Sequence, residues 1–215
     1  MAYFETLMRR LVLTSCLLLL AAGHFHAQTE PNPAEPKPAE PKQEKGRPAI
    51  SWIWKNKTPM DEERVFFRRE FELPPDVESA MISLVCDDWH HVFINGVDLG
   101  SAGGWNTWRN YDVLAHLKQG GRNVIAVEAK NEKGAAALAL RFRATLKDGK
   151  KLLVVSDGTW VCSSEVPENW QNLEFNAESW PKAVVVGRMG DKPWGLVVPP
   201  EPEETFASEG TPGSK

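Results

Sequence analysis

Apolar and polar residues alternate with a period of two along the middle of the chain. Between Val65 and Leu73, the odd positions carry Val, Phe, Arg, Phe and Leu, and the even positions carry Phe, Arg, Glu and Glu. The segment from Ala80 to Cys86 alternates in the same way. A period of two places successive side chains on opposite faces of a strand, whereas a helix repeats every 3.6 residues. The pattern therefore predicts strands that turn one face toward a core.

Further segments extend the set to about nine short strands. The others are expected at residues 51–54, 92–95, 123–130, 135–144, 151–156, 159–163 and 183–187. Asn95-Gly96 suits a tight hairpin, because both residues tolerate positive φ. One helical turn is expected, at residues 113–118, before Gly120-Gly121. Many short strands separated by turn signals predict an all-β fold, an antiparallel β-sandwich.

The N-terminal segment, residues 1–27, is typical of a signal peptide. Arg9 and Arg10 precede an apolar run at residues 11–22, which is too short for a transmembrane helix of about 20 residues. We therefore expect an exported protein, periplasmic or extracellular, with no transmembrane span in the mature chain. The run also contains a lipobox-like Leu-Thr-Ser-Cys ending at Cys16, so a lipoprotein remains open.

Two further segments lack the apolar residues that a core needs. Residues 28–48 are rich in Pro, Glu and Lys and contain the repeat Pro-Ala-Glu-Pro-Lys twice, which predicts a disordered, extended tether. Residues 199–215 are acidic and rich in Gly and Ser, which predicts a disordered tail. The β-sandwich domain is therefore expected at residues 49–198.

Size and charge exclude several classes of function. The net charge of −4 gives no cationic patch for phosphate backbones, so nucleic acid is not expected as a partner. A domain of about 150 residues can hold one core but falls short of the ~250 residues of a catalytic barrel. The chain has no Gly-x-Ser-x-Gly, Walker, Gly-x-Gly-x-x-Gly or Cys-x-x-Cys motif, and nothing selects a pair of catalytic carboxylates. We therefore expect a protein that is not an enzyme.

An ordered series of strand-end and turn motifs resembles the galactose-binding-like jelly roll. In chain order, the motifs are RREFEL at 68–73, CDDW at 86–89, VFINGVDLG at 92–100, Trp105, YDV at 111–113, GRNVIAV at 121–127, DG at 148–149, DGTW at 157–160, SWP at 179–181 and WG at 194–195. The series covers residues 50–197 and is most similar to the sugar-binding β-sandwiches attached to family 2 glycoside hydrolases and bacterial α-L-rhamnosidases. The resemblance implies a module that binds glycans or packs against a catalytic neighbour.

Nine tryptophans are a high number for a chain of this length. Indole rings stack on the apolar faces of sugars, while nearby polar groups bind the hydroxyls. Trp105 and Trp108 are the best candidates, because they lie in a glycine-bearing loop with Asn106 and Arg109 as polar neighbours. In the other interpretation, both indoles close the end of the sandwich as covering residues.

The run Asp87-Asp88-Trp89-His90-His91 is the densest group of titratable side chains. Alternate residues of an extended segment share a face, so we add Asp88 and His90 to the predicted ligand site. No cofactor is expected, apart from a structural calcium ion that Asp87, Asp88 and Asp98 would bind. Alternatively, Asp87 and Asp88 accept hydrogen bonds from turn amides.

The cysteines outside the signal region are Cys86 and Cys162. An oxidising, exported setting permits a disulfide between them, but each also lies in an apolar strand that suits a buried thiol. Both interpretations stay open at this stage.

Together these features predict an exported, non-catalytic, carbohydrate-binding or carbohydrate-associated β-sandwich module, whose partner is a glycan. The alternative is an interaction or assembly module that binds a protein of the cell envelope. A small glycan-acting enzyme is the third interpretation.

Overall fold

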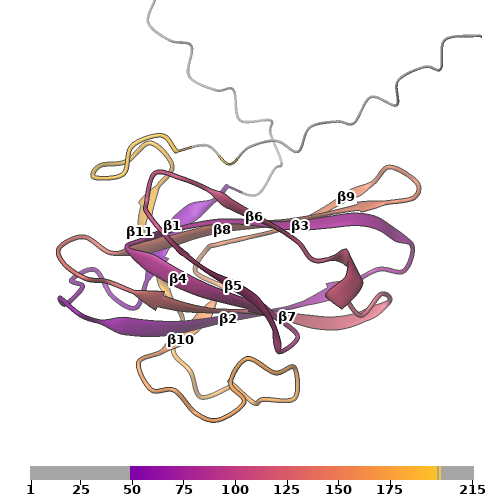
Figure 1. Cartoon of the computed structure of the whole chain (residues 1–215), viewed down its shortest axis with the longest axis horizontal. Coiled ribbons are helices and arrows are strands. Elements are labelled where there is room, and N and C mark those ends of the chain that lie inside the picture. The colour runs from indigo at the N-terminus through magenta and orange to yellow at the C-terminus, as the bar shows by residue number, and fades with distance from the viewer. Residues whose placement is uncertain (1–48, 198, 200–215) are drawn as a thin grey trace, which may run out of the picture. The chain divides into compact units, whose positions relative to one another are not determined.

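The computed structural model describes residues 49–197 and residue 199, which form two antiparallel β-sheets and one 3₁₀ turn, η1 (Leu114–His116) (Figure 1). The six-stranded sheet has the order β11–β1–β8–β3–β6, with β9 also paired to β8. Its strands are β1 (Ser51–Trp54), β3 (Val77–Asp87), β6 (Arg109–Asp112), β8 (Ala137–Leu146), β9 (Lys151–Val155) and β11 (Val184–Arg188). The five-stranded sheet has the order β10–β2–β7–β4–β5. Its strands are β2 (Arg64–Leu73), β4 (Trp89–Ile94), β5 (Val97–Gly103), β7 (Gly121–Lys130) and β10 (Val161–Ser163).

One hydrophobic core fills the space between the sheets. The alternation in β2 places Val65, Phe67 and Phe71 in this core, whereas Phe66 and Arg68 lie on the opposite face. Trp54 of the other sheet packs against Phe67, with ring centroids 5.7 Å apart. The predicted all-β antiparallel sandwich is confirmed.

The two strands that the hydrophobic pattern does not predict, β5 and β6, lie at sheet edges. Their sequences, VDLGSAG and RNYD, are largely exposed and contain few apolar residues. An edge strand pairs on one side only and contributes little to the core, so its sequence carries a weak period-two signal. The helical turn lies where it is expected but is only three residues long.

The disulfide that the sequence leaves open is not formed. Cys86 in β3 and Cys162 in β10 are both free, buried thiols within the core between the sheets. Burial raises the pKa of both thiols, to about 11 for Cys162. The cysteines therefore act as small apolar residues of the core.

A long loop, residues 164–182, covers part of the outer face of the five-stranded sheet (orange in Figure 1). Its Trp170 packs edge-on against Phe66, with ring centroids 5.1 Å apart, and also contacts Phe93 and Trp180. Arg68 of β2 is almost fully buried beneath this loop. Its guanidinium donates hydrogen bonds to the backbone carbonyls of residues 170, 172 and 175. One strand side chain therefore holds the loop at three points.

The predicted signal peptide, tether and tail lie outside the described residues, apart from residue 199 of the tail. Within the part of the chain that the structure describes, no helix has the length and hydropathy of a membrane span.

Replacing Arg68 should release the 164–182 loop. Arg68→Met leaves three carbonyls without their donor, and we expect a loss of about 2–4 kcal/mol in the free energy of unfolding. Limited proteolysis should then cleave first within residues 164–182. Arg64→Met is the matched control on the same strand, because the Arg64 side chain is 60% exposed and its ion pair with Glu128 contributes about 0–1 kcal/mol. Equal losses in the two variants would contradict this role for Arg68.

Candidate functional site

The loop that joins β5 to β6 forms one wall of an open hollow at the end of the sandwich. The hollow measures about 560 Å³ and is lined by Trp105, Asn106, Thr107, Trp108, Trp194, Leu196 and Val197. The structure thus brings together three of the predicted ligand residues: Trp105, Asn106 and Trp108. Arg109 is exposed at the start of β6 and does not line the hollow.

Two glycines allow this loop to leave β5 close to the neighbouring backbone. Gly104 has a φ of +102° and donates its amide to the carbonyl of Asp88 at 2.8 Å. A Cβ at Gly103 would lie 3.1 Å from the same carbonyl oxygen, which is tighter than an ordinary contact. The pair therefore sets the direction in which the loop carries Trp105.

The opposite wall is held by indole groups. The ring of Trp194 stacks on Trp52 at 4.9 Å, and its Nε1 donates to Oδ2 of Asp87 at 2.8 Å. Trp108 Nε1 donates to the carbonyl of Val197 at 3.1 Å, which ties the β5–β6 loop to the C-terminal segment. The two walls of the hollow are therefore fixed relative to each other.

Trp105 is the most accessible aromatic group of the hollow. The residue is 41% exposed, and none of the aromatic contacts among the described residues includes its ring. Asn106 and Thr107 follow directly, and their side chains hydrogen-bond each other at 3.1 Å. This arrangement places a flat apolar surface beside an amide and a hydroxyl, both of which donate and accept hydrogen bonds.

The prediction that His90 faces a ligand is wrong. His90 is 1% exposed, and its Nε2 lies 3.0 Å from the Tyr111 hydroxyl. Burial, together with the charges of Arg109 and His91, lowers the pKa of His90 to about 4, so the ring is neutral near pH 7. In β4, His90 lies on the same face of the strand as Val92 and Ile94, which point into the core.

Of the three aspartates predicted to bind calcium, Asp87 and Asp88 are neighbours, but Asp98 lies away from both. Asp88 accepts hydrogen bonds from the amides of Glu132 and Lys133, as the turn-capping interpretation expects. Asp98 accepts from the Gly100 amide and pairs with His91. Asp98 lies opposite Phe93 in the β4–β5 pairing, and Phe93 is five residues along the chain from Asp88, which corresponds to ~17 Å of extended strand. Among the described residues, no three His, Cys, Asp or Glu side chains group as metal ligands, so this donor set is corrected.

Asp87 is a buried carboxyl group behind the hollow. Burial raises its pKa to about 6, the neighbouring Asp88 adds to the shift, and the hydrogen bond from Trp194 opposes it. Asp87 thus carries a proton at mildly acidic pH that an exposed aspartate would have lost. Because Asp87 accepts a hydrogen bond from Trp194, a change in the protonation of Asp87 acts on a residue that lines the hollow.

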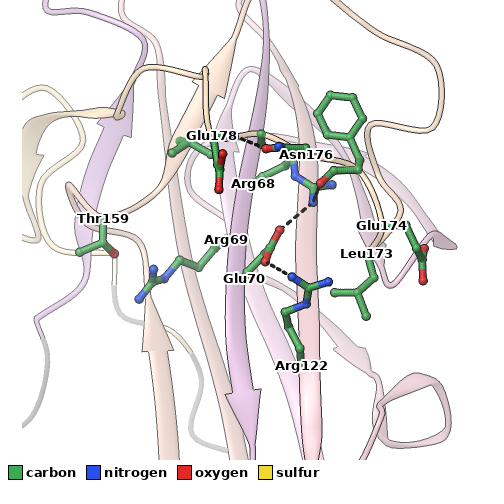
Figure 2. Close-up of a pocket in the computed structure, with 12 residues that line it drawn as sticks. Arg68, Arg69, Glu70, Arg122, Thr159, Leu173, Glu174, Asn176 and Glu178 are labelled. Carbon is green, nitrogen blue, oxygen red and sulfur yellow. Dashed lines mark hydrogen bonds and ion pairs between the residues drawn. The ribbon is translucent and has the colours of Figure 1, made fainter.

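A second pocket lies on the outer face of the five-stranded sheet (Figure 2). It measures about 420 Å³ and is lined by Arg68, Arg69, Glu70, Arg122, Thr159, Val161 and residues 173–178. The sequence analysis does not identify this pocket, because its residues come from four separate segments. The run Arg-Arg-Glu at 68–70 is the one local signal, since three consecutive charges are unusual in a half-buried strand.

The pH dependence of stability should show two opposing contributions. The pKa of Asp87 is higher in the fold than its ordinary value of 3.8, so Asp87 adds stability at low pH that is lost as the pH rises through 6. The pKa of His90 is lower in the fold than 6.5, so His90 adds stability at neutral pH that is lost as the pH falls toward 4.

Asp87→Asn should therefore steepen the loss of stability between pH 6 and pH 4, and His90→Gln should reduce that loss. Urea unfolding at several pH values measures both slopes. Curves that run parallel to that of the wild type in either variant would contradict these titrations.

Comparisons with known proteins place this geometry in context. No family model matches the chain. An α-L-rhamnosidase of Streptomyces avermitilis is 30% identical in an alignment of 163 positions, which covers 69% of this chain and 15% of the enzyme. The chain thus spans only a small part of that enzyme's length.

Two solved structures also resemble this chain in fold. The structure of the S. avermitilis α-L-rhamnosidase complexed with L-rhamnose has a TM-score of 0.65 and 28% identity over 71% of this chain and 16% of that chain. A lectin from Pleurotus ostreatus, in complex with GalNAc, has a TM-score of 0.63 and 27% identity over 72% of this chain and 49% of the lectin. The described part of the chain is therefore a galactose-binding-like β-sandwich domain, similar to one portion of α-L-rhamnosidases and to a fungal lectin.

Proposed function

We propose that this domain is an exported module that binds glycans in the hollow beside Trp105 and does not cleave them. The exposed indole of Trp105, next to the polar side chains of Asn106 and Thr107, is the observation that carries the proposal. Similarity to part of a rhamnosidase and to a lectin supports a carbohydrate ligand.

The chemistry of the hollow suits a sugar ring. One face of a pyranose presents C–H groups that pack on indole, and its hydroxyls need partners that donate and accept hydrogen bonds. Trp105 supplies the first, and Asn106 and Thr107 supply the second. The volume of about 560 Å³ lies within the range of small-molecule sites.

The first sugars to test follow from the two relatives with this fold. The S. avermitilis enzyme was solved with L-rhamnose, and the P. ostreatus lectin with GalNAc. We propose that this domain takes a sugar of one of these two kinds as a terminal or internal residue of a longer glycan.

The placement of the carboxylates near the hollow supports a non-catalytic role. A glycosidase needs two carboxyl groups flanking the scissile bond, one to donate a proton and one to act as nucleophile or base. Here the buried carboxyl group of Asp87 accepts a hydrogen bond from Trp194. The carboxyl group of Asp88 accepts hydrogen bonds from the backbone amides of Glu132 and Lys133. Both groups already serve the fold.

Truncating Trp105 should weaken glycan binding much more than folding. Trp105→Ala removes a stacking surface that contributes about 1–2 kcal/mol, which corresponds to a loss of affinity of roughly tenfold. Titration calorimetry with L-rhamnose and GalNAc measures this loss. Val166→Ala is the control, because Val166 is 62% exposed and lines neither the hollow nor the second pocket. A severe fall in the melting temperature of Trp105→Ala, or equal affinity in both variants, would refute the assignment.

The purified chain should not hydrolyse aryl α-L-rhamnosides or natural oligosaccharides from mildly acidic to neutral pH, because none of the described residues that line the hollow carries a carboxyl group. Release of the aryl alcohol and of reducing sugar measures turnover. Activity that is lost in Asp87→Asn or Asp88→Asn while the variant remains folded would instead establish a small glycan-acting enzyme.

A further inference from the structure

The second pocket exists because one strand is short. β10 pairs with only three residues of β2, and its last partner is Arg68. Beyond that point the edge of β2 is uncovered, and the loop at residues 173–178 closes over it from the outer face. In Figure 2, Arg68, Glu70 and Arg122 lie beside this loop, and Arg69 extends toward Thr159. None of the residues that line this pocket lines the hollow beside Trp105.

The walls of the pocket are held in place without a ligand. Arg68 binds the backbone carbonyls of residues 170, 172 and 175, so the loop is fixed to the sheet. Glu70 lies between two arginines, at 3.2 Å from Arg68 and 3.4 Å from Arg122. These three charges satisfy one another and form the floor of the pocket (Figure 2).

Three charged groups of the lining are left over. The guanidinium of Arg69 has no hydrogen bond or ion pair with another described residue, and it extends toward Thr159 in Figure 2. Glu174 and Glu178 of the loop are exposed, and no ion pair joins either of them to another described residue. The pocket therefore offers unused donors on the sheet side and unused acceptors on the loop side.

The balance of charges identifies the class of ligand. The lining contains three arginines and three glutamates, so it carries no net charge. The two loop carboxylates would repel an anion, and Arg69 would repel a cation. A hydroxyl group both donates and accepts, so adjacent hydroxyls of a sugar can accept from Arg69 and donate to a carboxylate at once. The volume of about 420 Å³ is that of a small-molecule site.

We propose that this pocket is a second saccharide site, which holds a neutral sugar unit by hydrogen bonds from its hydroxyls to Arg69 and to the carboxylates of Glu174 and Glu178. This site is independent of the hollow beside Trp105, and it does not require that the hollow bind sugar. With both sites occupied, one rigid domain would hold two sugar units and gain avidity for a branched or dense glycan.

The side-chain NMR resonance of Arg69 Nε–H reports on this pocket alone. We expect L-rhamnose, GalNAc or D-galactose, at up to about 50 mM, to shift this resonance in a saturable way with a millimolar Kd. The shift should persist in Trp105→Ala. Glu178→Gln should weaken the response at least several-fold, and Arg69→Met should abolish saturable shifts of the pocket's backbone amides. Glu165→Gln, an exposed glutamate of the same loop that does not line the pocket, is the control.

Several results would overturn the proposal. These are no saturable shift with any of the three sugars, an unchanged response in Glu178→Gln, or loss of the response in Trp105→Ala. A larger response to sodium acetate than to the sugars would identify an anion site instead. If the Arg69 resonance responds while Trp105→Ala leaves calorimetric binding unchanged, the second site stands and the proposed function of the hollow fails.

Discussion

Burial of one apolar core between two sheets is the constraint on which the rest of this structure depends. The central strands turn alternate side chains inward, and large groups such as Trp54, Phe67 and Phe142 fill the space between the layers. This packing occupies most of the inner face of each sheet. Groups that can meet a ligand are therefore left on end loops, on outer faces and at strand edges, and both candidate sites lie in such places.

Each site is then fixed by one buried polar contact. The Trp194–Asp87 hydrogen bond holds a wall of the hollow, and the guanidinium of Arg68 holds the loop over the second pocket. Unpaired polar groups are costly when buried, so each contact specifies a single position for a segment that has no strand pairing of its own. Local sequence places Trp105 on a loop, but these long-range contacts decide what the indole faces.

The sequence predicts the central strands well, because apolar and polar residues alternate wherever one face of a strand packs against the core. It fails for edge strands β5 and β6, whose pairing needs few apolar residues. It also misplaces His90, which the sequence analysis put on the ligand-facing side together with Asp88. His90 lies on the same face of β4 as Val92 and Ile94, and the alternation of the sequence already contains this signal. The second pocket cannot be predicted from the sequence, because no local pattern in residues 164–182 indicates that this loop folds back onto Arg68.

A crystal structure of the chain soaked with L-rhamnose or GalNAc tests the central claim most directly. We expect a sugar ring lying flat against the indole of Trp105, with its hydroxyls within hydrogen-bond distance of Asn106 or Thr107 and the walls of the hollow unmoved. A Trp105 ring folded over an empty hollow, with both sugars absent from it, would contradict the claim that this end of the sandwich binds glycans.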